Sequence, residues 1–201
     1  MVFFLFCLGS WQVYRLQWKN NLIQEISLTY SRTPEVFSEK SELFSKVIIQ
    51  GKIINQPEFV YSLGERGQYG FDVYLPFETI GRKLLLIRAG WTKEKFNLET
   101  NFLNTDKIIH AILLKPKRKN LFTPDNSNEL TFYIDLLSLE KKYSRKLYPL
   151  IAESTSDIKM GYNLKKPEKI VLPNNHLQYA LTWYSLCFVI IIAFLIYKKK
   201  I

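Results

Sequence analysis

The sequence predicts a membrane protein in which two transmembrane helices flank a mainly β extramembrane domain, an α+β fold of barrel- or sandwich-like form. Each end of the chain is uncharged, over the first fourteen residues and again from Leu177 to Tyr197, whereas all 18 acidic residues lie between. The middle is a series of short runs of β-branched and aromatic residues separated by Gly, Pro and Asn. We assign 1–17 to the first transmembrane helix, 18–175 to the domain, 176–197 to the second transmembrane helix and 198–201 to a basic cytoplasmic tail.

The N-terminal apolar segment is short for a membrane span. Val2–Leu8 is solidly apolar, and Arg15 ends the uncharged stretch, so about 14 residues are available where roughly 20 are needed. A signal peptide is an alternative, but the segment has no basic start and no small-residue cleavage pattern. We expect a transmembrane helix that is compressed or clipped at its start, or whose true start lies upstream, with Arg15 and Lys19 reaching outward to the interface.

The C-terminal segment has the length and composition of a full span. Tyr179–Tyr197 covers about 19 residues, and its ends carry aromatic residues in the pattern of an interfacial belt. Lys198, Lys199 and Lys200 follow at once. By the positive-inside rule these lysines place the C-terminus in the cytoplasm. We therefore predict a multi-pass protein of the cell inner membrane, or of the mitochondrial inner membrane if the source is eukaryotic, with both termini cytoplasmic and the domain outside.

The middle domain opens with a helix and continues with strands. Trp18 to Ser31 reads as a helix that continues from the membrane and ends before Pro34, because proline cannot continue a helix. Leu136–Tyr143 reads as one short helix. The period and composition of the remaining runs predict six strands, at 47–54, 58–63, 71–77, 83–91, 107–114 and 130–135.

Charge and cysteine usage narrow the function classes. The chain carries 28 Lys and Arg against 18 Asp and Glu, a net charge of +10. A basic domain tethered at a bilayer favours anionic lipid headgroups, haem propionates or an acidic partner. Nucleic acid is not expected as a partner, because the chain has membrane segments and no nucleic-acid-binding motif. Cys7 and Cys187 both lie in apolar segments and form no Cys-x-x-Cys, so we read them as small buried hydrophobes.

Catalytic constellations are missing from the sequence. The chain has only two histidines, His110 and His176, which form no two-histidine metal motif and no Ser-His-Asp order. The loop 64–70 is glycine-rich, but it lacks the Gly-Lys-Ser/Thr ending of a phosphate cradle and reads as a hairpin loop. We expect His110, within a strand, to be structural or at the surface. The protein is accordingly predicted not to be an enzyme, and a membrane-anchored enzyme of unknown type is the least supported alternative.

Two motifs at opposite ends of the chain resemble those of the Surfeit locus protein 1 family. Residues 8–19 contain Gly-x-Trp-Gln-x-x-Arg, and residues 173–184 contain Asn-x-His-x-x-Tyr-x-x-Thr-Trp. Gly70-Phe71, Pro76-Phe77 and Arg88-Ala89-Gly90-Trp91 agree in order and spacing. The last departs from the family's usual Arg-Gly-Trp, which leaves the role of Arg88 open. The resemblance covers essentially the whole chain.

The resemblance implies a function in respiratory-chain assembly. It implies a chaperone-like role in cytochrome c oxidase assembly, with the oxidase catalytic subunit and the haem a synthesis machinery as partners beside membrane lipid. Some members of the family are proposed to bind haem a. A non-catalytic scaffold that holds oxidase subunits and never binds haem is the alternative.

Helical spacing gathers the motif residues onto one face of each helix. Trp11, Arg15, Trp18 and Leu22 follow the i, i+4, i+7, i+11 pattern, and so do His176, Ala180, Trp183 and Cys187. If the two helices pair, Arg15 and His176 can converge at the outer interface. The alternative is an interfacial anchor, in which aromatic side chains form a belt and Arg15 reaches the headgroups.

Taken with the resemblance, these faces predict a haem a site. Histidine is a common axial ligand of haem iron, so His176 is the predicted iron ligand. Arg15 would pair with a propionate, while Trp183, Trp11 and Tyr179 supply aromatic surface. In the competing interpretation Asn174 or Asn175 caps the second helix by accepting backbone N–H bonds, and His176 bonds to headgroups.

Overall fold

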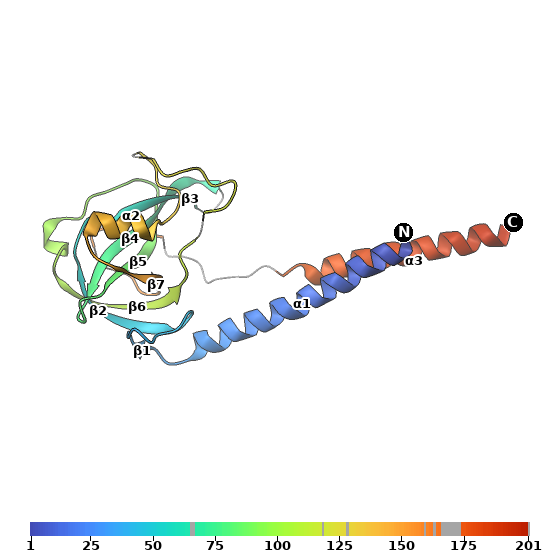
Figure 1. The fold of residues 1–201 in the computed structure, drawn as a ribbon, viewed down its shortest axis with the longest axis horizontal. Coiled ribbons are helices and arrows are strands. Elements are labelled where there is room, and N and C mark those ends of the chain that lie inside the picture. The colour runs from blue at the N-terminus through green and yellow to red at the C-terminus, as the bar shows by residue number, and fades with distance from the viewer. Residues whose placement is uncertain are drawn as a thin grey trace. The chain divides into compact units, whose positions relative to one another are not determined.

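The computed structural model describes residues 1–64, 67–117, 119–127, 129–158, 160–162, 164–165 and 174–200 (Figure 1). It divides into two compact units. One comprises Met1–Leu28 with Ile170–Ile201, and the other is Thr29–Lys169. The first is helical and the second is mainly β, so each is described by itself.

The β unit is a barrel. Strands β2 (Lys46–Ile53), β6 (Asp106–Leu114), β7 (Leu147–Ser154), β5 (Leu84–Thr92) and β4 (Tyr69–Thr79) are neighbours in that order, and β4 pairs again with β2 to close the ring. Strand β3 (Glu58–Leu63) extends β4, and the two-residue β1 (Glu35–Val36) extends β2. A 3-10 turn, η2 (Thr100–Phe102), precedes β6. Of the two predicted forms, barrel and sandwich, the closing β2–β4 pair establishes the barrel.

The barrel interior is filled by alternate residues of each strand. Ile49 and Ile53 of β2, Leu75 and Phe77 of β4 and Leu113 of β6 are each 0% exposed. Successive side chains of a strand point to opposite faces, so the odd-numbered residues of these strands form one contiguous core. Small barrels of this size are packed solid by side chains.

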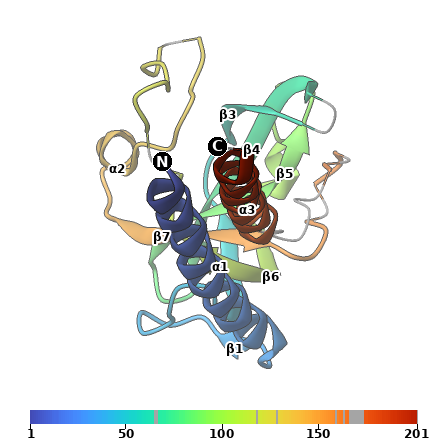
Figure 2. The ribbon, with the colours of Figure 1, turned by 90° about the vertical axis from the view of Figure 1, so that its right-hand side faces the viewer.

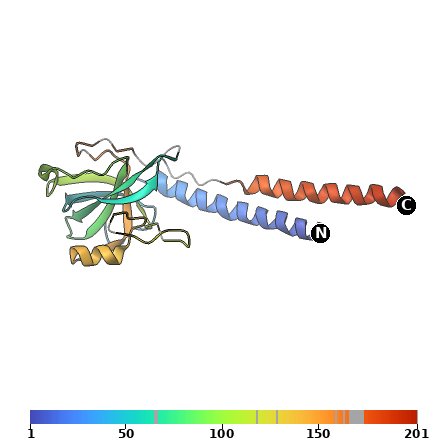
Figure 3. The ribbon, with the colours of Figure 1, turned by 90° about the horizontal axis from the view of Figure 1, so that it is seen from above.

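Helix α2 (Leu136–Tyr143) covers one outer face of the barrel (Figures 1 and 3). Leu136, Leu139 and Tyr143 pack on a second apolar cluster that includes Leu84 and Leu86 of β5. Because β5 is covered on both faces, Leu84–Ile87 is a continuous buried run. The helix begins at the N-cap Asp135, whose carboxylate accepts from the Leu137 amide, and ends at Ser144 in the left-handed conformation.

Most predicted elements of the domain are confirmed, and one is wrong. Five predicted strands match β2–β6, and the predicted helix at Leu136–Tyr143 matches α2. Leu130–Asp135 is not a strand. There the Asn126 side chain accepts from the Phe132 amide, and the Leu130 amide bonds to Ser127, so local side-chain bonds replace a strand ladder. The remaining barrel strand is instead β7, which the sequence analysis missed.

The helical unit contains two long helices that pair antiparallel. Helix α1 (Val2–Ser31) runs without a break through the predicted boundary at residue 17, and α3 (His176–Lys200) begins at the predicted histidine. Contacts run from Asn20 with Asn174 to Val2 with Cys187. Figures 2 and 3 show the two helices side by side, and Figure 3 shows α3 continuing past the N-terminal end of α1.

Among the described helices, α3 alone is long and apolar enough to cross a membrane, over His176–Lys199. Only 11% of that apolar stretch is buried within the protein. The core helix of a soluble protein would be mostly buried, whereas Phe188, Phe194 and Ile196 are more than half exposed. A bilayer is the solvent that suits such a surface, so α3 is a candidate membrane span.

Candidate functional site

A polar contact between the two helices joins Gln12 of α1 to His176, the first residue of α3. The Gln12 Oε1 atom lies 2.7 Å from His176 Nδ1, and both side chains are half-buried. Gln12 comes from the Gly-x-Trp-Gln motif of α1 and His176 from the Asn-x-His motif of α3. The two motifs at opposite ends of the sequence therefore meet directly.

A second polar contact lies beside the first. The Asn174 side-chain amide donates to Asn20 Oδ1 at 2.8 Å. Asn174 Oδ1 is buried and has no hydrogen-bond partner among the described residues, so Asn174 does not cap α3. Its side chain instead joins the two helices. The other cap named in the competing interpretation, Asn175, stays a prediction.

Close approach of the helices depends on a glycine. A Cβ atom built on Gly9 would lie 2.6 Å from Tyr184 Cε1. The Tyr184 ring lies against the bare Gly9 backbone, its hydroxyl is 3.2 Å from Ser10 Oγ, and its centroid is 5.7 Å from that of Phe6. Small residues allow this kind of packing between helices in a membrane. The glycine of the first motif thus receives the tyrosine that follows the second.

The other predicted site residues have different surroundings. The Arg15 guanidinium carbon lies 4.5 Å from the centroid of the Trp18 ring, a cation–π contact along α1. Trp11 and Tyr179 are 54% and 53% exposed, and Trp183 is half-buried. The hydrogen-bond partner of His176 is Gln12, one helical turn from Arg15, so the predicted convergence of Arg15 and His176 stays a prediction.

The barrel has its own buried ionic cluster, built around Arg88 of β5. Arg88 Nη2 donates to Asp72 of β4 at 2.7 Å, and Nη1 donates to Glu153 of β7 at 2.5 Å. The three side chains are 22%, 16% and 12% exposed. Between Val73 and Tyr74 the register of β4 with β5 shifts, which leaves Ala89 as an extra residue in a bulge. The departure at Arg88-Ala89-Gly90-Trp91 is therefore absorbed by a bulge, and Arg88 cross-links three strands.

Burial within this cluster acts on a neighbouring tyrosine. Tyr74 is 5% exposed. Burial, and next the negative charge of Asp72, raise its pKa well above the ordinary value. The Arg88 guanidinium acts in the opposite direction and lowers the pKa, but burial and the two carboxylates outweigh it, so the phenol is held neutral in the folded protein.

The tryptophan of the same motif packs on glycines. A Cβ atom on Gly70 would lie 2.2 Å from Trp91 Cζ2, and one on Gly64 would lie 2.7 Å from the same ring. The Gly64 amide donates to the Gln68 carbonyl, and Leu63 pairs with Tyr69. The predicted hairpin loop between β3 and β4 is thereby confirmed, and its glycines serve to seat the indole.

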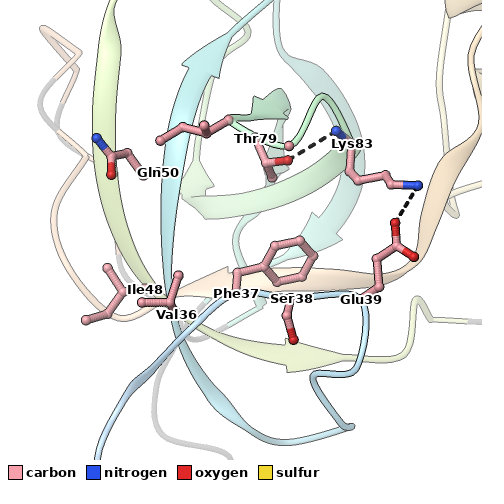
Figure 4. A pocket seen from close by; sticks show the side chains of 10 residues that line it. Val36, Phe37, Ser38, Glu39, Ile48, Gln50, Thr79 and Lys83 are labelled. Carbon is pink, nitrogen blue, oxygen red and sulfur yellow. Dashed lines mark hydrogen bonds and ion pairs between the residues drawn. The ribbon is translucent and has the colours of Figure 1, made fainter.

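A shallow hollow on the barrel lies between β1 and the β4–β5 turn (Figure 4). Its volume is about 210 Å³, and Phe37 and Ile48 contribute its apolar lining. Lys83 Nζ and Glu39 Oε1 pair at 2.5 Å, and the Lys83 amide bonds to Thr79 Oγ1. Its charged groups satisfy each other, so the hollow does not compete with the helix pair as a chemical site.

Sequence reasoning missed Gln12, Asn20 and Gly9 as site residues. A usable signal was present, because Leu5, Gly9 and Gln12 recur at i, i+4 and i+7. That spacing defines one face of a helix, and a polar amide on the face of an otherwise apolar segment needs a partner. The aromatic residues that suggested the predicted site, Trp11 and Trp18, lie on the neighbouring, exposed face.

Comparison with known proteins places these features in a family. The model of the SURF1 family matches residues 1–188. A "SURF1-like protein" of Rickettsia prowazekii is 29% identical over 96% of this chain and 84% of its own length. "Surfeit locus protein 1" of Xenopus tropicalis is 28% identical over 90% and 68%. The "cytochrome oxidase assembly protein SHY1" of Saccharomyces cerevisiae is 24% identical over 97% and 72%. Since the family model matches nearly the whole chain, including both motifs that meet in the helix pair, the chain belongs to the SURF1 family.

Proposed function

We propose that this chain is an assembly factor for haem-copper cytochrome c oxidase that binds haem a and hands it over during maturation of the catalytic subunit. The family, one of whose members is named as a cytochrome oxidase assembly protein, supports the assembly role. The observation that carries the haem role is the half-buried His176, held between two helices by Gln12. The protein acts by binding and positioning, without catalytic chemistry of its own.

The residues of the helix pair fit a haem. His176 supplies an imidazole, whose ring nitrogen is a donor that suits iron. Arg15 supplies a cation for a propionate, and Trp11, Tyr179 and Trp183 supply aromatic surface. With Nδ1 satisfied by Gln12, the other ring nitrogen of His176 is the one available to a metal. The exposed apolar surface of the helices, which suits contact with lipid, would cover the apolar edge of an iron porphyrin bound there.

The same proposal includes the topology. Both α1 and α3 span the inner membrane, both termini face the cytoplasm, and the barrel lies outside. The antiparallel contacts from Asn20–Asn174 to Val2–Cys187 support this arrangement, because antiparallel neighbours return the chain to its starting side. Lys198, Lys199 and Lys200 favour a cytoplasmic C-terminus. On the outer side the barrel is available to the oxidase subunit.

The test is the visible spectrum of protein purified from cells that make haem a. His176→Ala is expected to abolish or shift the Soret band while the protein remains folded in the membrane. His110→Ala is the matched control, because His110 is the other histidine and lies exposed on β6. An unaltered band in His176→Ala would refute the assignment of His176 as the ligand, because haem would still be bound. A Soret band missing from the unmodified protein would leave the scaffold that binds no haem. Normal oxidase activity in a deletion strain without a paralogue would refute the assembly role as well.

A further inference from the structure

We infer that Gln12 is a positioning residue that fixes the tautomer of His176, so that Nδ1 carries the proton and Nε2 presents its lone pair. The inference begins from one contact, between the Gln12 carbonyl oxygen and His176 Nδ1 at 2.7 Å. Its consequence for haem rests on the proposed function. The tautomer itself does not, and it can be measured in haem-free protein.

The donor and the acceptor of this hydrogen bond can be assigned from the chemistry of the two side chains. A neutral imidazole has one N–H donor and one acceptor nitrogen, and an amide oxygen can only accept. With Oε1 facing Nδ1, the proton resides on Nδ1. Metal-binding histidines usually donate their second ring nitrogen to such an oxygen, which orients the ring and raises its basicity as a ligand. Gln12 therefore prepares His176 for coordination through Nε2.

The neighbouring contacts hold Gln12 and His176 opposite each other. Asn20 and Asn174 bond on one side of the pair, and Tyr184 packs on Gly9 on the other. The first joins α1 to the residue two positions before α3 and the second joins α1 to α3, so together they fix how far one helix can slide along the other. Gln12 lies between Gly9 and Asn20 on the same helix, within the register that these contacts set.

A purely structural role for Gln12 predicts something different. If its hydrogen bond merely joined the helices, removing the bond between Asn20 and Asn174 would have a comparable effect on ligand binding. A positioning role predicts that only Gln12 variants change the electronic state of the imidazole. Asn20→Leu is therefore the matched variant, because it deletes an interhelical hydrogen bond without touching His176. Gln17→Leu, at an exposed position of α1, controls for loss of a glutamine.

The first experiment measures the tautomer in haem-free protein. His110→Gln leaves His176 as the sole histidine of the chain, so ¹⁵N-histidine labelling in nanodiscs gives one imidazole signal at about pH 8, where imidazole is neutral. The expected state is Nδ1–H. Gln12→Leu is expected to shift the population toward Nε2–H, and Gln12→Glu, which retains an acceptor, to restore Nδ1–H. An Nε2–H state before mutation, or an unchanged state in Gln12→Leu, would overturn the inference.

The second experiment titrates the same haem-free variants with haem a and follows the Soret band. Gln12→Leu is expected to weaken binding by about 10- to 100-fold, the usual cost of removing a partner that orients a ligand. Gln12→Glu is expected to bind haem and to lower its midpoint potential, because a carboxylate makes the imidazole a stronger donor. Equal losses in Gln12→Leu and Asn20→Leu would contradict the positioning role. If His176→Ala binds haem a as tightly as the unmodified protein, the proposed haem ligation fails, while the tautomer measurement still decides the role of Gln12.

Discussion

Replacement of Gly9 by leucine should lower the free energy of opening the helix pair by a measurable amount. The added Cβ would begin 2.6 Å from Tyr184 Cε1, against at least 3.4 Å for ordinary van der Waals contact. The ring must retreat by about 0.8 Å, a gap that forfeits a quarter to a half of each dispersion contact it leaves. Overpacking of this kind costs about 1–3 kcal/mol, and the clash is with the outer part of a side chain that can shift, which favours the lower part of that range. We expect a loss of about 1–2 kcal/mol in the free energy of opening the pair.

Cys187 offers a local assay for that opening. Its side chain is 6% exposed, and its thiol bonds to the Val2 carbonyl on the opposite helix. In a Cys7→Ser background, the rate at which a maleimide labels Cys187 follows the population of the open pair. Each 1.4 kcal/mol lost is a factor of about ten in that population, so Gly9→Leu should speed labelling several-fold to about thirtyfold.

The second-site variant makes this prediction decisive. Tyr184→Ala removes the ring that the leucine strikes, so Gly9→Leu in that background should slow labelling or leave it unchanged. A sign reversal of this kind is what a double-mutant cycle detects for residues in direct contact. If Gly9→Leu speeds labelling equally with and without Tyr184, the close contact is not what requires glycine, and the reasoning is refuted.

Three further predictions concern the barrel and the topology. Arg88→Met should lower the free energy of unfolding of the barrel by roughly 3 kcal/mol, because it leaves the carboxylates of Asp72 and Glu153 without their cation. The loss should be seen as a lower Tm, and an unchanged Tm would contradict the cluster's role. Because the pKa of Tyr74 is raised in the folded protein, the stabilising effect of this residue is complete below pH 10 and is lost as the pH rises above 10. Tyr74→Phe should therefore reduce the fall of Tm at alkaline pH, and an unaltered dependence of Tm on pH in that range would contradict this prediction. A periplasmic reporter fused at Asn126 should be active and one fused at the C-terminus inactive; cytoplasmic signal at Asn126 would exclude the topology.

The sequence predicted the barrel well because its strands carry a strong local signal. β2 alternates between core and surface, and β6 is a run of mostly aliphatic residues between polar ones, so the bounds of both fall within one residue of the predicted ones. β7 was not predicted because it contains Pro149, and proline ordinarily argues against a central strand. Here the register of β5 with β7 shifts between Leu84 and Leu86, so the ladder skips the proline. A shift of that kind depends on the neighbouring strand, and the local sequence does not encode it.

The helix pair shows a different limit. The helical face on α3 was predicted correctly, since Ala180 and Cys187 are buried and Trp183 is half-buried. On α1 the aromatic face was chosen, whereas the contact face follows Leu5, Gly9 and Gln12. Size and polarity favour tryptophan and arginine as site candidates when one helix is considered alone. The roles of Gly9 and Gln12 become visible only when the residues that face them on the other helix, Tyr184 and His176, are known.

The different roles proposed for the barrel and for the helix pair follow from how each is packed. In the described part of the barrel the interior is occupied by fully buried aliphatic and aromatic side chains, and its central charges are bound to one another by Arg88. A solid core of this kind cannot admit a ligand as large as a porphyrin. The helix pair combines an oriented imidazole, a cation and aromatic surface, and its outer faces suit lipid. Under the proposed function, a protein partner would therefore contact the barrel surface, and the proposed haem would bind at the helices, where Gln12 and His176 join the two ends of the chain.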